Sequence, residues 1–165
     1  MRLEHPIFHQ PLKTEIESYE IDTPGGYAAW PDGKDLGAKL SVWKVHEGEF
    51  PGDVDVGLVS DPYGFEDTPD AEWISSGVNS KGPRSMALGR HGNRFLWGFA
   101  GDPTQMTESA RRVFVNAVVY MKPFDGQPPL TKKRSSAGDW LVDPRGKGRT
   151  ESAAGTEEAA SSAGR

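Results

Sequence analysis

Cysteine is absent from this chain of 165 residues. Its absence excludes disulfide bonds, thiolate metal sites and a cysteine nucleophile. The sequence also lacks any apolar run of about 18 residues, so we expect no membrane-spanning helix and no membrane partner. The N-terminal stretch MRLEHPIFHQPLKTE has no apolar core of the kind that signal peptides carry, so the sequence as it stands predicts no export signal.

Positive charge is in deficit. The chain has 19 Lys and Arg against 24 Asp and Glu, which gives a formal net charge of −5. This balance disfavours attraction to phosphate backbones, so we expect no nucleic-acid partner. The four histidines follow no zinc-binding spacing, which leads us to expect no metal and no cofactor.

Turn-forming residues are plentiful, and the two ends of the chain differ in composition. The 20 Gly and 13 Pro predict many turns and short elements. From Asp143 onward alanine is the only apolar side chain, and such a stretch buries too little surface to offset its ordering entropy. We therefore predict a domain over residues 1–130 and a flexible, low-complexity tail over residues 131–165.

The clearest predicted element is a helix that Thr107 caps and Pro123 ends. Its apolar residues recur at helical spacing, and two valines widen the stripe, so we expect the helix to pack on two sides. These residues are Ala110, Val113, Phe114, Val115, Ala117, Val118, Val119 and Met121.

Upstream, the pattern predicts a β-hairpin with arms at residues 85–89 and 94–100, joined by a turn at residues 90–93. Phe95, Trp97 and Phe99 share one face of the second arm, and this face needs a partner layer. Further strands are expected at residues 16–21, 40–45 and 54–60, and a short helix at residues 70–75.

Two groups of polar residues are candidates for ligand contact. One is an acidic segment with interleaved aromatic rings, which suits sugar hydroxyls or a hard cation, and the other is a set of side chains at the predicted hairpin turn. The acidic segment also contains Glu72 and Phe65. The ligand-binding candidates are Asp61, Tyr63, Glu66, Asp67 and Asp70 from the segment and Arg90, His91 and Asn93 from the turn. The alternative for both groups is a local role, because Asp and Asn side chains cap their own turns and an arginine pairs with a nearby carboxylate.

Four stretches resemble the C-terminal part of trehalose-utilisation-type (ThuA-like) proteins, within the class I glutamine amidotransferase-like superfamily. They are HPIF at residues 5–8, SDPYGFEDTPDAEWISSGVNSKGP at 60–83, ALGRHGNRFLWGF at 87–99 and MTESARRVFVNAVVYMKPFDGQ at 106–127. The resemblance covers about residues 5–130. It implies the C-terminal portion of an open, flavodoxin-like α/β sheet, here a mixed sheet with a hairpin and one long C-terminal helix. Such proteins begin with several βα units that this sequence does not show ahead of His5, so we expect a truncated chain.

The same resemblance implies a link to sugar metabolism rather than a defined reaction. Glutaminases of the superfamily use a cysteine nucleophile, which this chain lacks, and Ile7 stands where their His-Pro-Glu motif has the acid. We therefore expect a domain that is non-catalytic by itself and contacts a carbohydrate or polyol.

Two alternatives stay open. The first is a metal-assisted or acid/base hydrolase that uses carboxylates of the acidic segment with His91 as the proton carrier. The second is a structural or interaction module whose apolar surface, around Trp97, needs a partner, either a second copy of the chain or the missing N-terminal half.

Overall fold

The structure is a computed structural model that describes residues 1–47, 58–62, 64–65, 67–135 and 138–142. Its internal contacts separate two units, Met1–Leu130 and Thr131–Arg165. The division falls at the residue beyond which the composition changes. Within the described ranges, no helix is long and apolar enough to cross a membrane.

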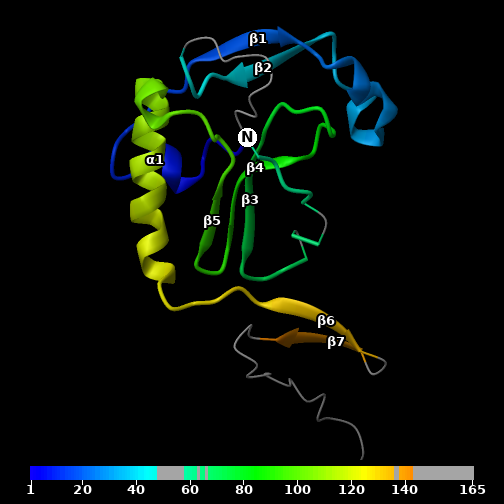
Figure 1. Ribbon diagram of the computed structural model, residues 1–165, viewed down its shortest axis with the longest axis vertical. Helices are drawn as coiled ribbons and strands as arrows, with labels where there is room; N and C mark the ends of the chain where they lie inside the picture. The colour runs from blue at the N-terminus through cyan, green and yellow to red at the C-terminus, as the bar shows by residue number, and fades with distance from the viewer. Residues whose placement is uncertain (48–57, 63, 66, 136–137, 143–165) are drawn as a thin grey trace, which may run out of the picture. The chain divides into compact units, whose positions relative to one another are not determined.

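The first unit is built on a three-stranded antiparallel sheet (Figure 1). β3 (Ala71–Ser76) pairs with β4 (Met86–His91), and β4 pairs with β5 (Arg94–Trp97). The predicted hairpin is thereby confirmed as β4 and β5. The short helix expected at residues 70–75 is wrong, because this stretch is β3. Pairing with β4 across the sheet decides its conformation and outweighs local preference.

The hairpin turn is shorter than predicted. Gly92 and Asn93 form it, while Arg90 and His91 are the last residues of β4 and not part of the turn. Gly92 has a φ of +55°, and a Cβ there would come within 2.6 Å of the Pro129 nitrogen. Both the backbone conformation and the close approach of the chain therefore require glycine.

A separate two-stranded ribbon consists of β1 (Ser18–Asp22) and β2 (Lys39–Trp43), which confirms two of the predicted strands (Figure 1). The strand predicted at 54–60 falls largely outside the described residues, although Ser60 forms a β-bridge with Met86. Short 3₁₀ helices connect these elements: η1 (Pro6–Phe8), η2 (Gly25–Ala29), η3 (Pro31–Gly33), η4 (Pro103–Gln105) and η5 (Lys122–Phe124).

Helix α1 (Glu108–Met121) begins and ends where the sequence predicted. The Thr107 hydroxyl caps it by accepting a hydrogen bond from the Ala110 amide at 3.2 Å, and Pro123 follows shortly after its last residue. Strands and one long helix thus combine in this chain, as the expected α/β class requires. Every strand pair among the described residues is antiparallel.

The main core lies between α1, η1 and the three-stranded sheet. Its buried members are Ile7 and Phe8 from η1, Ile74 from β3, Leu88 from β4, and Val113 and Ala117 from α1. The aromatic side chains Phe95, Trp97 and Phe99 pack against this core. Their face therefore has the partner layer that the sequence analysis called for, and the Trp97 ring is not an open apolar surface.

One face of α1 is buried, and it matches the predicted apolar stripe only in part. Ala110, Val113 and Ala117 are buried as predicted. Asn116 is fully buried, whereas Phe114 and Val118 are 42% and 60% exposed. The Asn116 amide explains the difference, because it donates to Ile7 O at 2.9 Å and to Leu12 O at 2.7 Å and accepts from Leu12 N at 2.9 Å. These three bonds fasten the N-terminal segment to the helix. The expectation that α1 packs on two sides is wrong for the described residues.

The second unit contains one antiparallel strand pair among its described residues. β6 (Thr131–Ser135) pairs with β7 (Gly138–Val142) over their full length, from Thr131 opposite Val142 to Ser135 opposite Gly138. The composition predicted a flexible tail over residues 131–165, without strands. The short separation of the two stretches along the chain makes their pairing local, and β7 holds the chain's last cluster of apolar residues.

Replacing Asn116 by Ala should lower the free energy of unfolding by about 2–4 kcal/mol, because the backbone groups of Ile7 and Leu12 would lose their partner inside the core. Urea unfolding followed by circular dichroism measures this. Asn93→Ala, at an exposed position of the hairpin turn, is the matched control and should change the value by less than about 0.5 kcal/mol. Equal losses in the two variants would contradict the anchoring role of Asn116.

Candidate functional site

A cluster of polar side chains centres on Glu72 of β3. Its Oε2 atom accepts hydrogen bonds from Arg90 Nε at 3.0 Å and from the Tyr120 hydroxyl at 2.6 Å. His5 Nε2 lies 3.5 Å from the same oxygen. The register of the sheet places Glu72 directly opposite Arg90, and α1 and the segment before η1 bring Tyr120 and His5.

Arg90 is held on several sides within this cluster. The residue is 6% exposed, and its Nη1 atom donates to Gly92 O at 3.0 Å. The guanidinium carbon lies 3.9 Å from the centre of the Phe124 ring, so the cation also rests on an aromatic face. The side chain, which the sequence analysis placed among ligand-contacting candidates, is thus paired inside the fold with Glu72.

The environment sets the protonation states of the Glu72 cluster. Burial raises the pKa of Glu72, but the hydrogen bonds from Arg90 and Tyr120 outweigh burial and leave that pKa below its usual value. Burial lowers the pKa of His5, against the opposing attraction of Glu72. Burial and the hydrogen bond to Glu72 raise the pKa of Tyr120 to about 12. At neutral pH one carboxylate therefore balances one guanidinium, while His5 and Tyr120 are neutral.

The tautomer of His5 follows from its contacts. Its Nδ1 atom accepts a hydrogen bond from the Ile7 amide at 3.4 Å, which makes His5 the N-cap of η1. In the neutral ring the proton is then on Nε2, the atom that faces Glu72. The Glu72 cluster is consequently an internal brace that joins β3, β4, α1 and the N-terminal segment.

A second polar contact joins Asp70 and His91, two of the candidates from the sequence. Asp70 Oδ1 lies 3.4 Å from His91 Nε2. Both side chains also hold the backbone of one residue, because Asp70 Oδ2 accepts from Leu130 N at 2.9 Å and His91 Nε2 donates to Leu130 O at 2.8 Å. The Phe65 ring meets the His91 ring edge to face, with centroids 5.6 Å apart. This pair fixes the chain where the first unit ends.

The remaining candidates do not join either cluster. Asp61, Asp67 and Asn93 are exposed on the surface. Tyr63 and Glu66 lie outside the described residues. Among the residues with described positions, no group of three or more His, Asp or Glu side chains is arranged to hold a metal ion.

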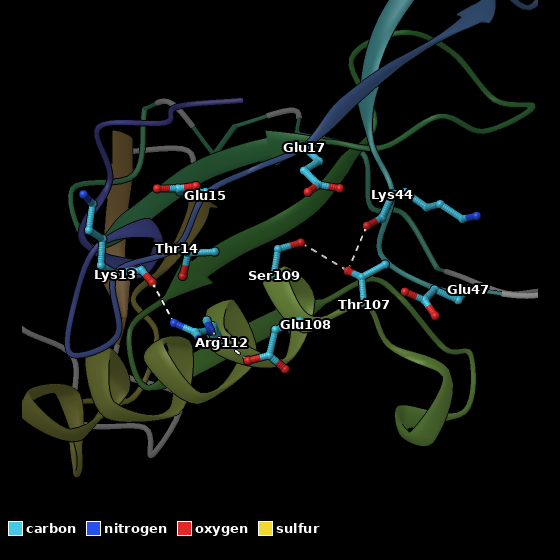
Figure 2. Close-up of a pocket in the computed structure, with 10 residues that line it drawn as sticks. All are labelled: Lys13, Thr14, Glu15, Glu17, Lys44, Glu47, Thr107, Glu108, Ser109 and Arg112. Atoms are coloured by element: carbon cyan, nitrogen blue, oxygen red, sulfur yellow. Dashed lines mark hydrogen bonds and ion pairs between the residues drawn. The ribbon is translucent and has the colours of Figure 1, made fainter.

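A groove of about 930 Å³ lies beside the beginning of α1, and its described lining includes none of the ligand-binding candidates from the sequence (Figure 2). Three segments form it: the stretch that leads into β1, the stretch that follows β2, and the first turns of α1. The lining residues are Lys13, Thr14, Glu15, Glu17, Lys44, Glu47, Thr107, Glu108, Ser109 and Arg112.

Hydrogen bonds hold the α1 side of the groove in place. The Thr107 hydroxyl donates to Lys44 O at 3.1 Å, and Ser109 Oγ accepts from the Trp43 indole N–H at 3.0 Å. Arg112 bridges two parts of the groove, because its Nε donates to Glu108 at 2.9 Å and its Nη1 to Lys13 O at 3.3 Å (Figure 2). The groove therefore has a fixed wall on the helix.

Four charged side chains of the groove lining are available to bind a ligand. The side chains of Glu15, Glu17, Lys44 and Glu47 are exposed, and none of them makes a hydrogen bond or ion pair with another described side chain. With four glutamates and three basic residues, the lining carries nearly balanced charge. It can offer both donors and acceptors to a bound molecule.

Comparison with protein-family models, with curated proteins and with solved structures finds no match for this chain. The roles of these residues are therefore derived from geometry alone.

Sequence reasoning named Glu72 as part of the acidic segment but missed its pairing with Arg90, and it missed Tyr120 and the groove altogether, for different reasons. Glu72 lies opposite Arg90 only when residues 71–76 form a strand, whereas the sequence predicted a short helix over residues 70–75. Tyr120 lies on α1 at position i+4 from the buried Asn116, so the buried face of the helix would have pointed to it. The groove joins residues about 100 positions apart, and no local pattern signals such a meeting.

The Glu72 cluster should make the fold sensitive to acid. The hydrogen bonds hold the pKa of Glu72 below the unfolded value of 4.5, so its stabilisation is present above that pH and is lost as the pH falls through the folded pKa. His5 has the same sign, because its folded pKa lies below the unfolded value of 6.5. Glu72→Gln should therefore be less stable than the parent at neutral pH, by a margin that shrinks in acid.

Urea unfolding at a series of pH values measures this margin. Glu20→Gln, on the exposed part of β1, is the control and should follow the parent curve at every pH. A margin that stays constant down to the most acid point would show that the charge of Glu72 does not act through its partners.

Proposed function

We propose that this chain is a ThuA-like domain that binds a neutral carbohydrate or polyol in the groove beside α1 and is non-catalytic by itself. The observation that carries the proposal is the lining of the groove, in which glutamates, basic side chains and hydroxyls alternate at nearly balanced charge. A strongly charged ligand would leave the lining groups of its own sign without compensation. A ligand with many hydroxyls, each able to donate and accept, matches both kinds of group.

The size of the groove supports a small ligand. A volume of about 930 Å³ falls within the range of roughly 300–1,000 Å³ that is usual for small-molecule sites. The lining residues that the structure describes include no aromatic side chain. Recognition would therefore depend on hydrogen bonds to hydroxyls rather than on stacking of a sugar face against a ring.

The hydroxyl groups of the groove favour binding over chemistry. Thr107 and Ser109 contact each other, the Trp43 indole and backbone groups in the described chain. None of these partners is a base that takes a proton from an attacking oxygen. Both hydroxyls instead serve the start of α1, and the free groups around them are carboxylates and ammonium groups suited to orient a ligand.

The positions of the resembling stretches support the ThuA-like part of the proposal. They fall on η1, on β3, on the β4–β5 hairpin and on α1, which together enclose one core. In the proposed fold, α1 covers one face of the closing part of an open α/β sheet. The antiparallel β3, β4 and β5 would then form the last strands of that sheet.

Titration calorimetry on the full chain tests the binding proposal. We expect heat of binding with neutral disaccharides or polyols and a weaker response to their phosphorylated or amino derivatives. Glu17→Gln should weaken binding about tenfold, since a charged acceptor at the groove is lost. Glu20→Gln lies outside the groove and is the matched control, with unchanged affinity. Absence of heat with every neutral compound at millimolar concentration would overturn the proposal.

Acid/base hydrolysis is the second candidate, and the contact between Asp70 and His91 is the observation that favours it. An aspartate that orients a histidine is a usual arrangement for a general base. In this structure, however, the atom of His91 that faces Asp70 also donates to Leu130 O. The pair therefore has a structural use that requires no substrate.

His91→Gln separates the two interpretations of this pair. We expect a lower melting temperature, because the contact with Leu130 would weaken, and unchanged polyol binding. Thermal unfolding and the calorimetric titration above measure the two quantities. If the variant instead keeps its melting temperature but loses a hydrolytic activity that the parent shows on a glycoside or ester panel, hydrolysis is the better proposal.

A further inference from the structure

The side of α1 turned away from the core carries exposed valines in its middle, and Phe114 lies at its edge, where its ring meets the Trp97 ring edge to face with centroids 5.1 Å apart. Phe114, Val115, Val118 and Val119 are 42%, 45%, 60% and 48% exposed. They adjoin one another because residues three and four positions apart are neighbours on a helix surface, which links Phe114 to Val118, Val118 to Val115, and Val115 to Val119. In a chain with a mean hydropathy of −0.62, four adjacent exposed apolar side chains of this size mark a surface that gains free energy from being covered. We call these four residues the outer face of α1.

The outer face lies between charges of opposite sign. Glu108 begins the helix and Lys122 directly follows it, and both are exposed. Glu108, Val115 and Lys122 recur every seven residues, with Arg111 and Val118 in between, which is the spacing of a helix–helix seam. The Arg111 guanidinium donates to Thr104 O at 3.1 Å, so it is drawn back toward the segment before the helix. The middle of this helix–helix seam is therefore formed by Val115 and Val118.

We propose that the outer face binds the outer face of a second copy of this chain, with the two α1 helices antiparallel. In this arrangement Glu108 of each copy faces Lys122 of the other, so unlike charges meet at both ends of the seam. A parallel pair would bring Glu108 against Glu108 and Lys122 against Lys122. The pattern is thus complementary to itself only when one helix is reversed, as a two-fold axis near Val115 requires.

The strength of the association follows from its size. Stable complexes bury about 1,200 Å² or more, and one pair of 14-residue helices with four apolar side chains each lies below that area. We therefore expect a reversible dimer whose fraction rises with concentration. This proposal does not depend on the groove, and its readout is a mass rather than ligand binding, so either proposal can fail without the other.

Sedimentation equilibrium of the full chain over about 1 μM to 1 mM tests the dimer. We expect the average mass to rise from 18.0 kDa, the mass of one copy, toward twice that value. Val118→Glu should remain a monomer throughout, with an unchanged circular dichroism spectrum and melting temperature measured at low concentration, because the side chain is largely exposed. Val78→Glu, at an exposed valine outside α1, is the matched control and should associate like the parent.

Charge exchange tests the antiparallel arrangement. Lys122→Glu alone and Glu108→Lys alone should each weaken the dimer, and the two changes together should restore it. A parent chain that stays at 18.0 kDa at every concentration would overturn the proposal and leave coverage by residues 131–165 or by an unlike partner. A dimer that Val118→Glu leaves intact, or one that the double exchange fails to restore, would overturn it as well.

Discussion

Asn116 is the constraint on which the rest of the first unit depends. A fully buried amide in the middle of a helix costs free energy unless each of its polar atoms has a partner, and the partners here are the backbone groups of Ile7 and Leu12. The N-terminal segment therefore cannot leave α1 without leaving the Asn116 amide unpaired inside the core. Because the segment is fixed at two points, η1 is held against the sheet, and its Ile7 and Phe8 side chains fill the space between sheet and helix.

This anchoring also accounts for the Glu72 cluster and the groove. His5 precedes the anchored Ile7, which holds its ring beside Glu72. On the other side of the anchor, Lys13 follows Leu12 and is tied by its carbonyl to Arg112, one turn before Asn116. The same helix face thus helps to position both the Glu72 cluster and the lining of the groove. In the Glu72 cluster the side chains bind one another, whereas Glu15, Glu17 and Glu47 of the groove make no hydrogen bond or ion pair with another described side chain.

Local chemistry decided what could be predicted from the sequence. The cap at Thr107, the proline at 123 and the glycine at 92 act within a few residues, so α1 and the hairpin could be predicted. β3 could not, because its pairing with β4 joins residues 10 to 20 positions apart. The buried face of α1 was predicted only in part, because apolar periodicity ranks Phe114 and Val118 above Asn116. Asn116 is buried instead because its amide donates to two carbonyl groups of a segment more than 100 residues away, which no local pattern reveals.

Helix α1 contributes both to the groove and to the outer face, and Glu108 links the two. The Glu108 side chain lines the groove and pairs with Arg112, and in the proposed dimer it faces Lys122 of the second copy. An association that drew the carboxylate away from Arg112 would loosen the link between Arg112 and Lys13, and with it one wall of the groove. A ligand that stabilises this wall would oppose such a change by mass action. Ligand binding and self-association, if both occur, are therefore expected to be coupled through the Glu108 carboxylate, which belongs both to the groove and to the ends of the proposed dimer interface.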